Sequence, residues 1–336
     1  MIISDKQELR RCVKQMVRRA GVCEALLDFN VTHGEVGVEP LLDLWARPAA
    51  TPGEALKRTT AEQTPFAADA RAMFAALDAL DLSVRDLDRA HTLQMQYERP
   101  AYLREVLDTM RAMCVLVRVN ADDAAQTAFE DDRFEPLLSC AGEWFVPGRY
   151  GVDYAGAAKR IAEAADLCGA HNLLLEHFDD YTLRYCLLPL CQDRGFALHV
   201  YLKNEEEVAR FALLLDEFEG VRALVRACEK AQKRLIDEAV RRVRLLVCLD
   251  GAELMDYALE RLGTRFVPYS SCASLPEQML GRWLLEKEKI WQALCDVYLP
   301  LARTGYELES SAVERDVRRL LSENLLALCR PDTLQA

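Results

Sequence analysis

The strongest constraint on this fold is an alternation of short apolar runs with amphipathic helical patterns. The runs have the length of strands and are apolar at nearly every position, which is typical of strands buried on both faces. Joined by helices, about eight such strands in one chain of this length predict an α/β fold, a closed (β/α)₈ TIM-type barrel. The predicted strands are Leu26–Phe29, Cys114–Val119, Phe134–Ser139, Asn172–Glu176, Phe196–Leu202, Val221–Ala227, Val243–Leu249 and Arg265–Val267.

The remaining segments fit one barrel domain over residues 1–336. Residues 35–113 predict a helical insertion after the first strand, because they are punctuated by prolines and no Gly/Ser linker bounds them. Residues 276–330 predict extra C-terminal helices, which we expect to pack outside the barrel. The predicted crossover helices are Ala157–Leu167, Leu183–Arg194, Glu205–Phe218, Lys230–Arg241 and Ala252–Leu262.

The segment after the last predicted strand is a strand-to-helix loop. Thr264–Val267 ends at Pro268, and a long helical pattern begins near Pro276. Ser274 and Glu277 have the spacing of a capping box at the start of that helix. In a parallel α/β protein such loops all open on the carboxyl-end face of the sheet, so this loop is expected to line a ligand site.

The charge and cysteine content exclude several classes of protein. A formal net charge of −12 gives no basic surface for nucleic acid or an anionic membrane, so neither is an expected partner. The N-terminus lacks a signal peptide and no stretch has the length of a membrane span, which predicts a cytoplasmic protein. The 12 cysteines are scattered through apolar segments without a CxxC motif, as is typical of buried reduced thiols.

Two parts of the chain resemble the uronate isomerase family of the amidohydrolase superfamily. Leu259–Pro268, the helix that follows and Ser311–Asn324 are similar to the family's last strand and C-terminal helices. Ala25–Thr32 is similar to its first strand. The resemblance implies a (β/α)₈ barrel and a metal-assisted interconversion of hexuronate aldoses and ketoses.

The chain departs from that family at the residues that carry its chemistry. The family's His-x-His pair after the first strand is replaced by Asn30-Val31-Thr32, and neither Asn30 nor Thr32 is a good ligand for a transition metal. The family's Ser-Asp-Ala-Arg after the last strand is replaced by Ser271-Cys272-Ala273-Ser274, so the aspartate and the arginine are missing. We therefore expect no metal cofactor, and a divalent metal such as zinc only if a site has been rebuilt around His33 or His177.

The five histidines divide by their position in the predicted elements. His33 lies one residue beyond the family's second histidine, where a bulge would let it replace that ligand, although a loop histidine explains it equally. His177 follows the fourth strand, in the position of a site residue, although a strand end with its polar residues in water explains it equally. His199 lies within an apolar strand and is expected to be a hydrogen-bonded interior histidine, while His91 and His171 have no companions at ligand spacing and are expected at the surface.

Polar residues at the strand ends form the candidate site. The candidate catalytic residues are Lys203, Lys230, Asp250, Tyr269 and Cys272, and mixed residues of this kind can perform acid–base chemistry. A helix N-terminus would favour the Cys272 thiolate, but no histidine base is identifiable beside it, so an inert cysteine is the competing interpretation. Asn120 and Glu143 belong to the same strand-end set, and the candidate substrate-binding residues are Asn30, Thr32, His33, His177 and Glu229.

Two functions remain open from the sequence. The replaced metal and substrate positions favour a non-catalytic barrel that binds a small sugar acid or related metabolite, or that associates with another protein. They also predict little or no uronate isomerase activity. The alternative is a divergent sugar-acid isomerase or hydrolase with a rebuilt or metal-independent site. A homo-oligomer is compatible with either function, and the fold alone does not decide between them.

Overall fold

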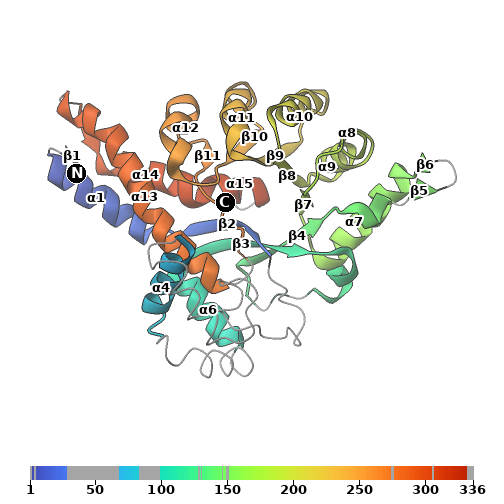
Figure 1. Ribbon diagram of the computed structural model, residues 1–336, viewed down its shortest axis with the longest axis horizontal. Coiled ribbons are helices and arrows are strands. Elements are labelled where there is room, and N and C mark those ends of the chain that lie inside the picture. The colour runs from blue at the N-terminus through green and yellow to red at the C-terminus, as the bar shows by residue number, and fades with distance from the viewer. Residues whose placement is uncertain are drawn as a thin grey trace.

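Eight parallel strands form one curved sheet in the computed structural model, with helices along its convex side (Figure 1). The structure describes residues 2–3, 5–28, 68–82, 99–127, 129, 131–145, 147–148, 151–273, 276–304 and 306–330. The order β11-β10-β9-β8-β7-β4-β3-β2 follows the chain from one edge to the other, as the predicted α/β alternation requires. The strands are β2 (Val22–Leu27), β3 (Ala112–Val119), β4 (Phe134–Ser139), β7 (Asn172–Leu175), β8 (Ala197–Leu202), β9 (Arg222–Ala227), β10 (Leu245–Cys248) and β11 (Phe266–Val267).

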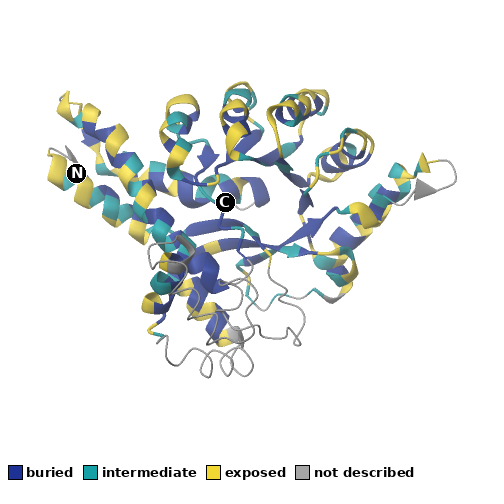
Figure 2. Cartoon of the chain, viewed as in Figure 1, coloured by how far each residue is buried: buried dark blue, intermediate teal, exposed yellow. Residues whose placement is uncertain are grey.

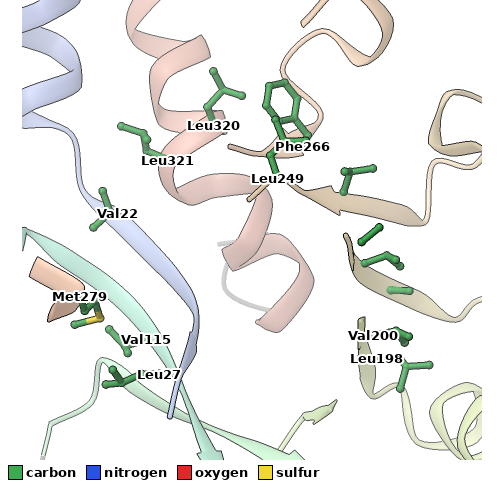
Figure 3. Close-up of a cluster of buried hydrophobic side chains, with 14 of the residues drawn as sticks. Val22, Leu27, Val115, Leu198, Val200, Leu249, Phe266, Met279, Leu320 and Leu321 are labelled. Carbon is green, nitrogen blue, oxygen red and sulfur yellow. The ribbon is translucent and has the colours of Figure 1, made fainter. Parts of the chain in front are cut away.

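The strands are buried on both faces, which explains their nearly continuous apolar character (Figure 2). In β8, Leu198 and Val200 belong to the large cluster beneath the surrounding helices, while Ala197 belongs to the cluster on the inner face. Figure 3 shows part of the outer cluster, with Met279 of a long helix close to Val115 and Leu27 of the sheet. The period-two alternation therefore places one set of side chains against the helices and the other inside the curve.

The two ends of the strand order approach each other after β11. Leu27 forms an isolated parallel bridge with Ala273, and the amide of Asp28 donates to the Ala273 carbonyl at 2.8 Å. The first strand thus contacts the loop that follows the last strand, while β2 and β11 themselves form the two edges of the strand order.

Most crossover helices lie close to their predicted positions, and each covers the sheet with its apolar face (Figure 2). The crossover helices are α7 (Tyr154–Cys168), α8 (Asp180–Thr182), the π-helix η3 (Leu183–Leu187), α9 (Leu188–Arg194), α10 (Glu205–Glu217), α11 (Glu229–Arg241) and α12 (Met255–Leu262). The short elements are the 3₁₀ helices η1 (Ala121–Gln126), η2 (Gly142–Phe145) and η4 (Ala252–Leu254), and the hairpin strands β5 (Pro147–Gly148) and β6 (Gly151–Val152).

Two helices of the predicted insertion, α4 (Ala68–Ala79) and α6 (Arg99–Met110), lie on one side of the sheet with α1 (Lys6–Arg19) and α13 (Pro276–Arg303) (Figure 1). The contact between α13 and α4 is close, because a Cβ atom at Gly281 would collide with the backbone carbonyl of Ala72. Only glycine permits this approach of two helices. Residues 35–67 and 83–98 of the predicted insertion lie outside the described residues.

The C-terminal helices differ from the expectation that they all pack outside the sheet. α14 (Ser310–Arg318) and the π-helix η5 (Arg319–Glu323) lead into α15 (Asn324–Cys329), which lies on the concave side (Figure 1). Leu325, Leu328 and Cys329 share the inner cluster with Cys23 and Cys114. The physical reason is that the amino-end half of the inner face is apolar and needs apolar side chains to cover it.

Hydrogen bonds hold this last helix in place and tie the N-terminal segment to the body. The Arg222 guanidinium donates to the carbonyls of Ala327 and Leu328 at 3.2 and 2.9 Å, where the helix C-terminus leaves acceptors unsatisfied. Strands β1 (Ile2–Ile3) and β12 (Leu308–Glu309) pair antiparallel and join the N-terminal segment to the segment between α13 and α14.

The predicted first strand is displaced along the chain. We expected Leu26–Phe29, whereas β2 covers Val22–Leu27 and Phe29 lies outside the described residues. The cause is Glu24, a carboxylate that looks polar in the sequence but is fully buried in the strand.

No helix among the described residues combines the length and the apolar character that a membrane crossing requires.

Candidate functional site

A cavity of about 300 Å³ lies inside the curve of the sheet. Strand β2 is not a sheet neighbour of β7, β8 or β9, so a cavity lined by all four must lie across the concave face. Apolar side chains form much of its wall, and five polar side chains interrupt them. Its lining residues are Ala25, Leu26, Leu174, Glu176, His177, His199, Val200, Tyr201, Leu224 and Arg226.

His199 is the most deeply buried polar residue of the cavity wall, with 4% of its surface exposed. Its Nε2 lies 3.2 Å from Oδ1 of Asn172, a residue of β7 that is fully buried. Burial lowers the pKa of His199 to about 3, so the imidazole is neutral at physiological pH. The sequence expectation of a hydrogen-bonded interior histidine is confirmed, and its partner is Asn172.

Arg226 brings a positive charge to the cavity from the end of β9. Its Nη2 donates to Oδ1 of Asp250 at 2.9 Å, and its Nη1 contacts Sγ of Cys272. Its Nε has no hydrogen-bond partner among the described residues. This Nε is enclosed, so the contacts with Asp250 and Cys272 anchor the guanidinium, and what it brings to the cavity wall is its positive charge.

A second ion pair holds Glu176, another lining residue of the cavity. The Arg118 guanidinium from β3 meets both carboxylate oxygens of Glu176, at 2.9 and 3.1 Å. Arg118 also lies 3.7 Å from Asp28 and donates to Asn120. This pairing fixes the Glu176 carboxylate at the cavity wall, where it accepts hydrogen bonds.

Cys272 occupies the loop after β11 with a φ of +46°, a left-handed conformation that is uncommon for a residue with a side chain. Burial raises the pKa of its thiol, although the positive charge of Arg226 opposes the shift. The thiol is consequently protonated near neutral pH and is a poor nucleophile. The geometry favours the interpretation of Cys272 as a packing residue that contacts Arg226.

Glu24 connects the first strand to the loop that carries Cys272. Its carboxylate accepts hydrogen bonds from the Ser270 hydroxyl, from the Ser271 amide at 3.0 and 3.1 Å, and from Nε1 of Trp283 at 2.8 Å. A fully buried carboxylate with several donors is a strong anchor, because its loss leaves those donors unpaired. Glu24 thus holds the loop in position beside the cavity.

The other predicted site residues occupy varied positions around the sheet. His177 lines the cavity and is exposed, and Asp250 is exposed and paired with Arg226. Tyr269 is partly buried, its ring 5.3 Å from Trp283 in an edge-on contact, and burial raises the pKa of its hydroxyl. Lys203, Glu229 and Lys230 are exposed and are not among the cavity-lining residues, and Asn30, Thr32 and His33 lie outside the described residues.

Three residues of the site were not singled out from the sequence. Glu24, Arg118 and Arg226 all lie within predominantly apolar strands. The signal for the two arginines is the period of two. Arg226 shares the inward face of β9 with Leu224, and Arg118 shares the inward face of β3 with Cys114 and Leu116. Within the described ranges, no group of three His, Cys, Asp or Glu side chains is arranged to hold a metal ion.

The comparisons with known proteins give one strong structural similarity. No family model matches the sequence, and no curated protein matches it. A uronate isomerase from Bacillus halodurans superposes with a TM-score of 0.80 at 15% sequence identity, covering 99% of this chain and 100% of that one. A glucuronate isomerase from Caulobacter crescentus aligns with a TM-score of 0.46 at 10% identity, over 97% of this chain and 95% of that one. The fold of this chain resembles that of the Bacillus halodurans uronate isomerase.

Proposed function

We propose that this protein binds a small organic acid of the sugar-acid type in the cavity between β2 and β7–β9, without metal-dependent isomerase activity. We propose further that it is a divergent relative of the uronate isomerases, in which the residues for metal binding have been replaced. The fold similarity to a uronate isomerase supports the relationship. The replacement of the family's ligands by Asn30, Thr32 and Cys272 supports the loss of catalysis.

The observation that carries the proposal is the position of Arg226. Its guanidinium contacts Cys272, the residue that stands where the resembled family has its metal-binding aspartate. Asp250 pairs with this guanidinium on one side, and the positive charge on the side of Cys272 disfavours a divalent cation and attracts a carboxylate. Arginine binds carboxylates with two parallel hydrogen bonds, which gives orientation as well as affinity. The same residue therefore disfavours the family's metal and favours an acid ligand.

We propose further that the curved sheet closes into a (β/α)₈ barrel. The Leu27–Ala273 bridge and the Glu24 hydrogen bonds to Ser270 and Ser271 support closure between the first strand and the segment after the last. In such a barrel the carboxyl-end loops surround one pocket, which is the position of the cavity.

A second candidate function rests on Glu176 and His177. These consecutive residues both line the cavity, and a carboxylate beside an imidazole can move a proton on a bound ligand. A divergent sugar-acid isomerase or hydrolase with a rebuilt site is therefore the alternative. This alternative requires that the protein convert the bound sugar acid, whereas the binding proposal requires no conversion.

Isothermal titration calorimetry with glucuronate tests the binding proposal. The wild-type protein is expected to bind it, and Arg226→Gln is expected to weaken binding by about tenfold or more, as loss of a charged hydrogen bond does. Arg234→Gln is the matched control, because Arg234 lies on α11 with about half of its side chain exposed and pairs with Glu238. Equal affinity in wild type and Arg226→Gln would contradict the proposal, and so would the absence of any binding.

Metal content and turnover separate the two candidate functions. Protein purified without chelator is expected to carry no stoichiometric zinc or manganese, and to leave glucuronate and galacturonate unchanged with either metal added. Turnover that Glu176→Gln or His177→Ala abolishes would establish the alternative function instead.

A further inference from the structure

The hydrogen bond between His199 and Asn172 determines which nitrogen of the imidazole carries the proton. A carbonyl oxygen only accepts, so Oδ1 of Asn172 at 3.2 Å requires a proton on Nε2 of His199. The neutral ring carries a single N–H, so Nδ1 is left as a bare acceptor. Asn172 sits in the adjacent strand, where Leu174 pairs with His199 in the sheet register, and is fully buried.

Nδ1 of His199 is available to a ligand. His199 lines the cavity, and Nδ1 has no hydrogen-bond partner among the described residues. The amide nitrogen of Asn172 is enclosed by protein and has no hydrogen-bond partner among the described residues, whereas Nδ1 of His199 is not enclosed in this way. An acceptor that faces a largely apolar cavity has few alternatives to a hydrogen bond from the ligand, and leaving it unpaired is costly.

The charge state supports this role for His199. Burial keeps the ring neutral, with a pKa of about 3, so it cannot serve as a cation for a carboxylate. A neutral lone pair repels a carboxylate oxygen and attracts a hydroxyl hydrogen. Arg226 supplies the positive charge from the end of β9, two strand positions beyond Leu224 on the same face.

We propose that the ligand is a hydroxy acid bound in one orientation, with a hydroxyl donating to Nδ1 of His199 and the carboxylate against Arg226, and that Asn172 is the residue that positions His199. The inference rests on the proposed binding function and adds the orientation and the discriminating group. A cavity of about 300 Å³ is of the size that small-molecule sites occupy.

The tautomer is tested without any ligand, by long-range ¹H–¹⁵N correlation NMR on the ¹⁵N-histidine-labelled protein at pH 7. We expect the His199 ring to show protonated Nε2 and unprotonated Nδ1. Asn172→Leu is expected to remove this preference, whereas Asn172→Asp, which retains an acceptor, is expected to keep it. A proton on Nδ1 in the wild type overturns the inference, because Asn172 would then present its amide nitrogen to the ring.

The orientation is tested by calorimetry with three small probes. Gluconate carries both groups, hexanoate has the carboxylate without hydroxyls, and sorbitol has hydroxyls without the carboxylate. We expect gluconate to bind at least about tenfold more tightly than either of the others, because each lacks one partner for a buried polar group. His199→Phe should remove the preference over hexanoate, and Arg226→Gln should remove the preference over sorbitol.

Failures of the two proposals are distinguishable. If none of gluconate, hexanoate and glucuronate binds, the proposed function is wrong and the orientation with it, while the NMR result still decides the role of Asn172. If hexanoate binds as tightly as gluconate, the binding function stands and the hydroxyl contact to His199 is wrong.

Discussion

Glu24 shows how one buried charge fixes the position of a loop. Its carboxylate receives donors from the Ser270 hydroxyl, the Ser271 amide and the Trp283 indole, and it is fully buried. We expect Glu24→Ala to lower the free energy of unfolding by about 3 kcal/mol or more, because these three donors and the Leu26 amide lose their acceptor. Urea unfolding followed by circular dichroism measures the change. Glu163→Ala is the control, since Glu163 is exposed on α7 and should change stability by less than about 0.5 kcal/mol. Equal effects of the two substitutions would contradict this role of Glu24.

His199 predicts a pH dependence of stability. Burial lowers its folded pKa to about 3, while an unfolded histidine titrates near ~6.5. Protonation therefore favours the unfolded state, so the stability linked to the neutral ring is fully present above about pH 6.5 and is lost as the pH falls toward 3. We expect wild type to lose about 2 kcal/mol more than His199→Gln between pH 6.5 and pH 5 in urea titrations. Parallel losses in the two proteins would show that His199 does not titrate this way.

At the scale of elements, the close approach of α13 to α4 determines how the predicted insertion is attached. Glycine to alanine usually stabilises a helix interior by about 1 kcal/mol. At Gly281 we expect the opposite sign, a loss of about 1–3 kcal/mol, because the added methyl group meets the Ala72 carbonyl. Hydrogen exchange should report faster opening of α4 in Gly281→Ala. Gly142→Ala is the control, since open space surrounds Gly142 and little change is expected. Stabilisation by Gly281→Ala would contradict the contact.

Most helices and strands could be predicted from the sequence. Period and length located β4 at its observed bounds and placed most other strands and crossover helices within a few residues. The position of α15 was not predictable, because an apolar helix face does not say whether it covers the outer or the inner side of a sheet. The first strand was predicted too late in the chain because Glu24 is a charged residue type. The partners that bury the Glu24 carboxylate, Ser270 and Ser271, are more than 240 positions away in the sequence.

For the whole molecule, the sequence predicted the α/β architecture and the face that would carry a site better than the site itself. Residues at the strand ends were expected to form the site. Of these, His177 lines the cavity and Asp250 pairs with Arg226. Arg226 and Arg118 were missed because they sit inside apolar strands. Their pairing with Asp250 and Glu176 depends on the order and curvature of the strands in the sheet, which only the fold determines.

The central claim is that the cavity binds a sugar acid without converting it, and one NMR measurement addresses both parts. Glucuronate is incubated with the protein, with and without added manganese or zinc, and its ¹H spectrum is followed for several hours with saturation transfer from the protein. We predict saturation transfer to glucuronate that is strongly reduced in Arg226→Gln at a glucuronate concentration near the wild-type dissociation constant, together with an unchanged spectrum. Resonances of a new ketose appearing at an ordinary enzymatic rate, about 1 s⁻¹ or faster, would contradict the account, as would the absence of any saturation transfer in the wild-type protein.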